Sequence, residues 1–75
     1  MKKQMYKVIF DATKTLLNGN EYRVRKAVYM PRFDEVTGKH ITPEQQIERG
    51  TAALKSDHYY NIEYKSTVAT ELFLA

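Results

Sequence analysis

Apolar and polar residues alternate along the first strand-like stretch of the chain, residues 5–13. Every second position is apolar, and the residues between are polar or charged except for Ile9. The apolar positions are Tyr6, Val8, Phe10 and Ala12. Two-residue alternation in β-forming residues predicts a strand with one face toward a core. Asn18-Gly19-Asn20 follows, and these residues accept the positive φ angles of a tight hairpin turn.

A second alternating stretch, residues 21–30, predicts the return strand of that hairpin. Its apolar positions are Tyr22, Val24, Val28 and Met30. Lys26 falls among them and interrupts the pattern. Two explanations stay open: a bulge at residues 25–27, or an edge position at which the lysine stem lies along the core. Pro31 has no amide hydrogen and ends the pairing.

Residues 32–41 leave two interpretations open. Thr37-Gly38-Lys39 lies between Phe33 and Ile41 and fits a short second hairpin with Gly38 in the left-handed conformation. An irregular loop is the alternative. A strand in this region is therefore optional in the predicted fold.

The strongest local pattern begins at Thr42 and predicts a helix that ends around residue 56. Thr42 suits the N-cap, Pro43 the first helical position, and Gln45 completes a capping box with Thr42. The inner stripe of the helix is Ile47, Gly50 and Leu54. Glycine lowers helix propensity by about 1 kcal/mol relative to alanine. We therefore expect the backbone at Gly50 to pack closely on a sheet.

The last segment, residues 59–74, alternates again and predicts one long strand, or two strands that bend near Ser66-Thr67. Its apolar parity comprises Tyr60, Ile62, Tyr64, Val68, Leu72 and Leu74. The element order is then β-β-(β)-α-β in a single domain, residues 1–75. We expect an α+β fold: a small antiparallel sheet of three to four strands with one helix packed on one face.

Composition narrows the class of protein. The chain has 75 residues and no cysteine, which excludes disulfides and thiolate metal sites. A domain of this size buries a thin core, and this favours association with another chain. Its longest apolar runs are too short to span a membrane, and its N-terminus lacks a signal-peptide pattern. We therefore expect a cytoplasmic protein.

Residues that carry catalysis or bind metals are sparse. His40 and His58 are the only histidines, and Glu44 and Glu48, one helical turn apart, have no recognised ligand spacing. The three glycines form no phosphate-binding loop, and neither serine has a nucleophile-elbow context. The sequence therefore predicts a protein that is not an enzyme and has no metal site or cofactor.

A basic run in the second strand points to one class of partner. The net charge is +3 at pH 7, so the chain is mildly basic. On a strand, Arg23 and Arg25 project from one face, where cations beside exposed aromatic rings would bind single-stranded nucleic acid. The residues for this function are Lys7, Arg23, Arg25, Lys26 and Lys65. Asp11, Glu63 and Glu71 share the parity of that face and dilute its positive charge.

Six tyrosines point to another class of partner, because tyrosine and arginine are enriched at protein interfaces. Tyr29 and Tyr59 lie off the apolar parity, so we expect them to be exposed. Phe73 lies on the second face of an apolar C-terminal strand, which is an edge for pairing with another chain. The residues predicted for protein binding are Tyr29, Tyr59, Arg23, Arg25 and Phe73.

In size and composition the chain resembles the short, cysteine-free, single-domain proteins that bacteriophages make to block a host enzyme or defence complex. The resemblance rests on no motif, so no residue role is carried over from it. It implies a viral, non-enzymatic interaction module, an inhibitor or adaptor, that binds another protein. Two alternatives stay open: a nucleic-acid-binding domain that uses the basic sheet face, and a structural homodimer formed by strand addition.

Overall fold

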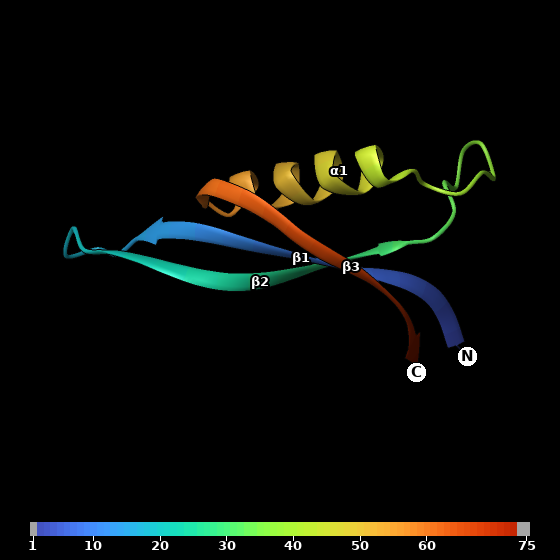
Figure 1. Cartoon of the computed structure of the whole chain (residues 1–75), viewed down its shortest axis with the longest axis horizontal. Helices are drawn as coiled ribbons and strands as arrows, with labels where there is room; N and C mark the ends of the chain where they lie inside the picture. Colours follow the sequence, from blue (N-terminus) through green and yellow to red (C-terminus); the bar gives the residue numbers. More distant parts are fainter. Residues whose placement is uncertain (1, 74–75) are drawn as a thin grey trace.

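A computed structural model describes residues 2–73 and has three strands and one helix in this part of the chain. The elements are β1 (Lys2–Thr15), β2 (Glu21–Pro31), α1 (Pro43–Ser56) and β3 (Tyr60–Phe73). The sheet is antiparallel with the strand order β2-β1-β3, and α1 lies across one of its faces (Figure 1). The predicted α+β class and the order β-β-α-β are confirmed. Leu74, which the predicted last strand included, lies outside the described residues.

The hairpin between β1 and β2 closes where the Asn-Gly pattern predicts it. Leu16 N donates to Asn20 O at 2.7 Å, and Gly19 N donates to Leu16 O at 2.9 Å. Gly19 has a φ of 87°, in the left-handed region that a residue with a side chain rarely adopts. The register from Met5 opposite Pro31 to Thr15 opposite Glu21 has no bulge. The edge explanation for Lys26 is therefore the one that holds, because β2 is an edge strand.

Residues 32–42 form a loop, and the optional strand is reduced to one isolated bridge between Phe33 and His40. Asp34 organises this loop, because its Oδ1 atom accepts from Val36 N at 2.8 Å and from Thr37 N at 3.1 Å. Two antiparallel backbone bonds also close it, from Asp34 N to Lys39 O at 2.7 Å and from Ile41 N to Arg32 O at 3.0 Å. The structure therefore adopts a minimal form of the predicted second hairpin, with Gly38 in the left-handed conformation at a φ of 70°, but forms no full strand here.

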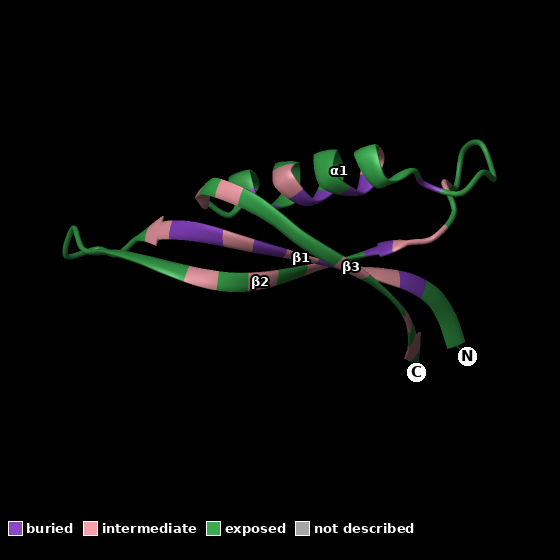
Figure 2. Cartoon of the chain, in the orientation of Figure 1, coloured by how far each residue is buried: buried purple, intermediate pink, exposed green. Residues whose placement is uncertain are grey.

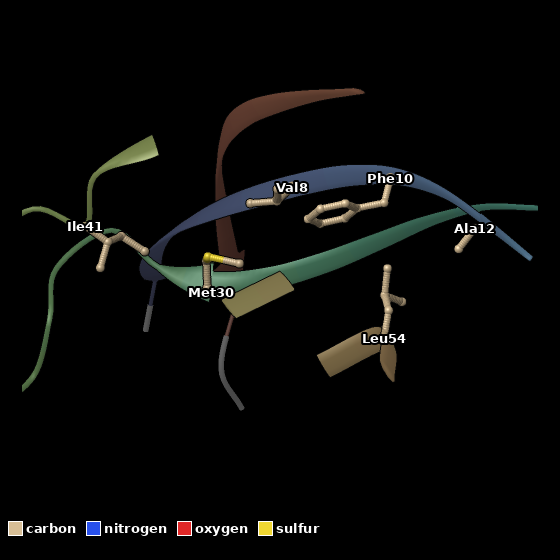
Figure 3. Close-up of a cluster of buried hydrophobic side chains, with 6 residues drawn as sticks. All are labelled: Val8, Phe10, Ala12, Met30, Ile41 and Leu54. Carbon is tan, nitrogen blue, oxygen red and sulfur yellow. The ribbon is translucent and has the colours of Figure 1, made fainter. Parts of the chain in front are cut away.

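The core lies between α1 and the face of the sheet toward it. It consists of six buried side chains: Val8, Phe10, Ala12, Met30, Ile41 and Leu54 (Figure 3). Figure 2 shows the buried positions concentrated on β1 and on the side of α1 that faces it. β1 supplies half of this cluster. It is the central strand, with β2 on one side and β3 on the other, and α1 lies across it.

The inner stripe of α1 differs from the predicted one at a single position. Gly50 and Leu54 are buried as expected, but Ile47 is exposed and Gln46 is buried in its place. The Gln46 amide is fully used, since Nε2 donates to Ile41 O at 3.3 Å and Oε1 accepts from Thr67 Oγ1 at 2.9 Å. A buried polar group costs little when it is hydrogen-bonded in this way. The prediction for Ile47 was wrong because hydrophobicity alone does not fix the rotation of a short helix.

Gly50 lies directly against the ring of Phe10. A Cβ atom built at Gly50 would overlap the Cζ and Cε2 atoms of that ring. The expected close approach of the helix backbone to the sheet is therefore confirmed. The predicted capping box is also present, since Gln45 N donates to Thr42 Oγ1 at 3.1 Å and Thr42 N donates to Gln45 Oε1 at 2.9 Å.

Two register shifts in β3 overturn the predicted parity of the last strand. One falls where Ile9 and Phe10 oppose Ser66 and Tyr64, so that Lys65 is the extra residue. The other falls between the pairs Asp11–Glu63 and Thr13–Tyr60, beside Asn61, whose φ is 49°. Each extra residue exchanges the faces of all positions beyond it. As a result, the side chains of Tyr60, Tyr64 and Val68 do not share one face.

We predict that Gly50→Ala destabilises the protein, although alanine is the better helix former. The added methyl group must displace Phe10, and overpacking of a core costs about 1–3 kcal/mol. The measurement is chemical denaturation followed by circular dichroism. Ala52→Gly is the matched control, because Ala52 is an exposed position of the same helix. At position 52 the difference in stability between alanine and glycine should follow helix propensity alone, so the protein with alanine should be more stable by about 1 kcal/mol. If alanine gave the more stable protein at both positions, the proposed Gly50–Phe10 contact would be contradicted.

Candidate functional site

The face of the sheet opposite α1 is uncovered in the part of the chain that the structure describes (Figure 1). We call it the open face. It carries the odd-numbered residues of β1 and the residues that oppose them on β2 and β3. Beginning near the hairpin, three cross-strand rows are Asp11–Arg25–Glu63, Ile9–Ala27–Ser66 and Lys7–Tyr29–Val68. Polar groups thus gather toward the hairpin, and apolar groups gather toward the middle of the sheet.

Charged side chains from all three strands form a connected network on the open face. Arg25 of β2 holds Asp11 of β1 through two contacts, with Nε–Oδ1 at 2.9 Å and Nη2–Oδ2 at 3.4 Å. Lys65 of β3 lies between two carboxylates, with its Nζ atom 2.9 Å from Glu63 Oε1 and 3.6 Å from Asp11 Oδ2. Arg23 completes the network, with its Nη2 atom 3.4 Å from Glu63 Oε2. The bulge residue Lys65 therefore links the acids of the central strand and the edge strand.

Arg23 is held by more than its ion pair. Its Nη1 atom donates to Thr13 Oγ1 at 3.0 Å and to Asn61 O at 2.9 Å. The guanidinium therefore spans from β2 across β1 to the second bulge of β3. Thr13 is buried beneath it, although Thr13 points away from the core. The fork of donors on one planar group allows this multiple attachment, which a lysine would not give.

The network shifts the pKa values of its members in the directions that its contacts require. The hydrogen bond from Arg25 lowers the pKa of Asp11 and raises that of the Arg25 guanidinium. The hydrogen bond from Lys65 lowers the pKa of Glu63 and raises that of the Lys65 ammonium. Arg25, Glu63 and Lys65 are exposed and Asp11 is half-buried, so water and salt screen these interactions. The network fixes the geometry of the face more than it stabilises the fold.

An exposed apolar patch borders this network, and we call it the Tyr29–Val68 patch. Tyr29 is 46% exposed and Val68 is 49% exposed, and they flank Lys7 in one cross-strand row. Ile9 and Ala27 continue the patch in the next row. Nothing in residues 2–73 covers these side chains. Large aromatic and β-branched groups on a hydrogen-bonded sheet form a rigid surface, which lowers the entropy lost when a partner binds.

The structure brings together most of the residues predicted for binding, but not all. Lys7, Arg23, Arg25, Tyr29 and Lys65 lie on the open face. Tyr59 does not, because it precedes β3 and packs against the core from the helix side. Lys26 also lies on that side, with its Nζ atom 5.7 Å from the centroid of the Tyr59 ring.

Phe73, the remaining predicted residue, lies apart from the patch. It is 77% exposed and opposes Lys2, five positions along β1 from Lys7. At about 3.4 Å per residue, it is roughly 17 Å away from the Tyr29–Val68 row. It also has the opposite parity, so it points to the other face. The protein-binding set is therefore separated into a central group of Tyr29, Arg23 and Arg25 and two residues that lie apart from it, Tyr59 and Phe73.

Sequence reasoning missed Val68 and Tyr60 as open-face residues. Tyr60 opposes Thr13, and its hydroxyl lies 2.9 Å from Thr15 Oγ1. Tyr60 and Val68 were assigned to the core because they fall on the apolar parity of β3. Only the two register shifts reverse this assignment. Ile9 was expected on the face opposite the apolar parity of the first strand, and its place in the row Ile9–Ala27–Ser66 confirms this, although it was not among the residues predicted for binding.

Groups of side chains that could hold a metal ion are absent from residues 2–73. No cluster of three or more histidine, aspartate or glutamate side chains in this part of the chain has metal-site geometry. A hollow of about 370 Å³ lies between the start of β1 and the loop after β2. Its acidic residues already meet cations, with Asp34 Oδ2 2.7 Å from Arg49 Nη2 and Glu35 Oε1 3.9 Å from Lys3 Nζ. Within the same residues, no helix combines the length and apolarity required for a membrane span.

We predict that the open-face network weakens in acid. Because the pKa of Asp11 is lowered on folding, its contribution to stability is present above its ordinary pKa and is lost as pH falls through the folded value. The Asp11 carboxyl should titrate below its ordinary range when followed by NMR, and Arg25→Ala should return it toward that range. Lys14→Ala is the control, since Lys14 lies on the other face beside Tyr59. An unchanged titration in Arg25→Ala would contradict the Asp11–Arg25 pairing.

The open face thus has an exposed apolar patch and a bordering charge network. Comparisons with models of protein families, with curated protein sequences and with solved structures find no match to this chain. The geometry of the open face is therefore the basis on which a function is proposed.

Proposed function

We propose that the protein is a non-enzymatic interaction module that binds another protein on the open face of its sheet. The observation that carries this proposal is the Tyr29–Val68 patch. Two large apolar side chains, each about half exposed, lie in the middle of a sheet face that no described element covers. An exposed apolar patch rimmed by polar groups is typical of a protein-docking site.

The charge network supports a role in specificity. Arg23, Arg25 and Lys65 hold Asp11 and Glu63 in fixed positions beside the patch. Rim charges of this kind steer a partner and select its orientation more than they add affinity. A partner would therefore place apolar groups over Tyr29 and Val68 and complementary charges toward the hairpin end of the face.

The pairing of the cations weighs against the nucleic-acid alternative. Three cations and two carboxylates meet in the network, which leaves one net positive charge. Phosphate binding requires cations that are free to neutralise phosphates. Of the other two members of the predicted basic set, Lys26 lies on the other side of the sheet, and Lys7 lies on the open face between Tyr29 and Val68. A protein partner therefore agrees better with the described face than a polyanion does.

More specifically, we propose that the protein is an inhibitor or adaptor of the kind that the size and composition of the chain suggest. Such a protein acts by occupying the surface of an enzyme or a defence complex and performs no chemistry. A small rigid sheet with an apolar anchor and a polar rim meets that requirement. The target would be a protein of the native host.

The test begins with capture of the partner on tagged protein from a lysate of the native host, with and without nuclease. Affinity for the purified partner is then measured by calorimetry. We predict that Tyr29→Ala weakens binding by about 30-fold, since hot-spot tyrosines contribute about 2 kcal/mol or more. Tyr22→Ala is the matched control, because Tyr22 lies on the same strand with similar exposure but on the other face. Its affinity should stay within about twofold of wild type, as expected of a residue outside an interface.

Two results would overturn the proposal. Equal effects of Tyr29→Ala and Tyr22→Ala would place the interface away from the open face. Retention of nucleic acid as the sole partner, with affinity that falls steeply as salt rises, would establish the alternative function.

A further inference from the structure

The two edges of the sheet differ in how they are protected against pairing with another strand. The β2 edge carries Arg23, Arg25 and Lys26 and ends at Pro31. Charged residues and proline are the usual means by which an edge strand avoids pairing. The β3 edge has no charged residue from Ser66 to Thr70 and no proline along its length. Its sequence there, Ser-Thr-Val-Ala-Thr, is rich in strand-forming residues.

The direction of the backbone groups along β3 follows from the register. Arg32 N donates to Gln4 O at 3.4 Å, so the backbone groups of Gln4 face β2. Because successive residues of a strand direct these groups to opposite sides, those of Lys7 face β3. Val68, which opposes Lys7, therefore bonds toward β1. The N–H and C=O groups of Thr67 and Ala69 consequently point away from the sheet.

We propose that a second copy of this chain pairs antiparallel with β3, with Val68 on the two-fold axis. In this register Thr67 of one copy opposes Ala69 of the other, and both direct their backbone groups into the new ladder. Val68 opposes its own counterpart as a non-hydrogen-bonded pair, the arrangement that brings side chains closest. Two exposed β-branched side chains then contact each other on the open face.

The charge order of β3 is self-complementary about Val68, which fits a second copy of the same chain as the occupant. Lys65 and Glu71 flank the uncharged stretch at equal distances from Val68. Two-fold pairing therefore sets Lys65 of each copy level with Glu71 of the other. Lys65 lies on the open face beside Glu63 and Asp11, whereas Glu71 lies on the helix side with its Oε2 atom 3.7 Å from Lys2 Nζ, so Lys65 and Glu71 form no ion pair across the new ladder. Within the described part of β3, no like charges oppose each other in this register.

A second reason to expect a second copy on the β3 edge is that the resulting assembly is closed. A two-fold interface uses the β3 edge of both copies and leaves only the two protected β2 edges at the ends of a six-stranded sheet. Further strand addition is thereby blocked, and the assembly stops at a dimer. The open face also becomes twice as wide, with both Tyr29–Val68 patches on the same side. This inference is independent of the proposed function, because the dimer forms whether or not a partner binds.

The first test is the oligomeric state of the full chain by analytical ultracentrifugation over a concentration series. We predict that the wild-type protein is a dimer and that Ala69→Pro is a monomer. Proline at this position removes an amide hydrogen directed outward, so it breaks no bond to β1. Ala27→Pro is the matched control, because Ala27 directs its amide outward from the β2 edge, and this variant should remain a dimer. Circular dichroism and cooperative unfolding should show that both variants fold.

The second test fixes the register. Because the chain has no cysteine, Val68→Cys introduces a single thiol. A non-hydrogen-bonded pair has Cα atoms about 4.5 Å apart, within the range that a disulfide spans. Val68→Cys should therefore form a covalent dimer on mild oxidation. Ser66→Cys should remain reduced, because it opposes Thr70 of the second copy and lies two residues from the axis.

The following results would contradict the pairing of β3 with a second copy. A wild-type protein that is monomeric throughout the series would show that β3 does not pair with a second copy. A dimer that persists in Ala69→Pro, or crosslinks equally at Ser66→Cys and Val68→Cys, would show association through another surface or register. Addition of a strand from a different protein would leave the isolated chain monomeric and would be detected only in the complex.

Discussion

The contact between the Phe10 ring and the backbone of Gly50 sets how closely α1 approaches the sheet. With a glycine at this point the helix lies against the central strand, and the ring fills the space that a side chain would need. The other buried side chains, from Val8 to Leu54, surround this contact. In so small a domain the helix can cover only one face of the sheet. The opposite face is left to solvent or to a partner as a direct consequence.

The open face is organised by polar contacts because it has no core to organise it. Arg23 and Arg25 reach from the edge strand across the central strand, and Lys65 reaches back from the other edge. Each contact is screened by water, yet together they hold five charged side chains in one arrangement. Beside them the apolar groups of Tyr29 and Val68 stand uncovered. Such a division into a fixed polar region and an apolar anchor is typical of a surface that recognises a protein.

The bulge at Lys65 joins these features. By inserting one residue it turns Lys65 into the charge network and carries Val68 from the core side to the open face. The same shift places Thr67 on the helix side, where its hydroxyl donates to Gln46. One irregularity in the edge strand therefore shapes the apolar patch, the network and the seating of the helix. It also leaves the following residues, 66–70, as a regular and uncharged edge.

The sequence by itself determined the elements and their order, because the signals for these are local. Alternation defined the strands, Asn18-Gly19 the hairpin, Thr42 and Gln45 the start of the helix, and Gly50 its close approach to the sheet. Arg23, Arg25 and Tyr29 were also placed on one face correctly, since β2 pairs without a bulge.

Only the tertiary structure decided which residues of β3 lie on the open face and which residue of the first half of α1 is buried. The bulges depend on how β3 fits against β1, which is about 50 residues away along the chain, and no local pattern encodes that fit. The burial of Gln46 in place of Ile47 likewise depends on Ile41 O and Thr67 lying within reach of its amide. The same holds for the neutralisation of the basic strand, because Asp11 and Glu63 meet its arginines only once three strands are side by side.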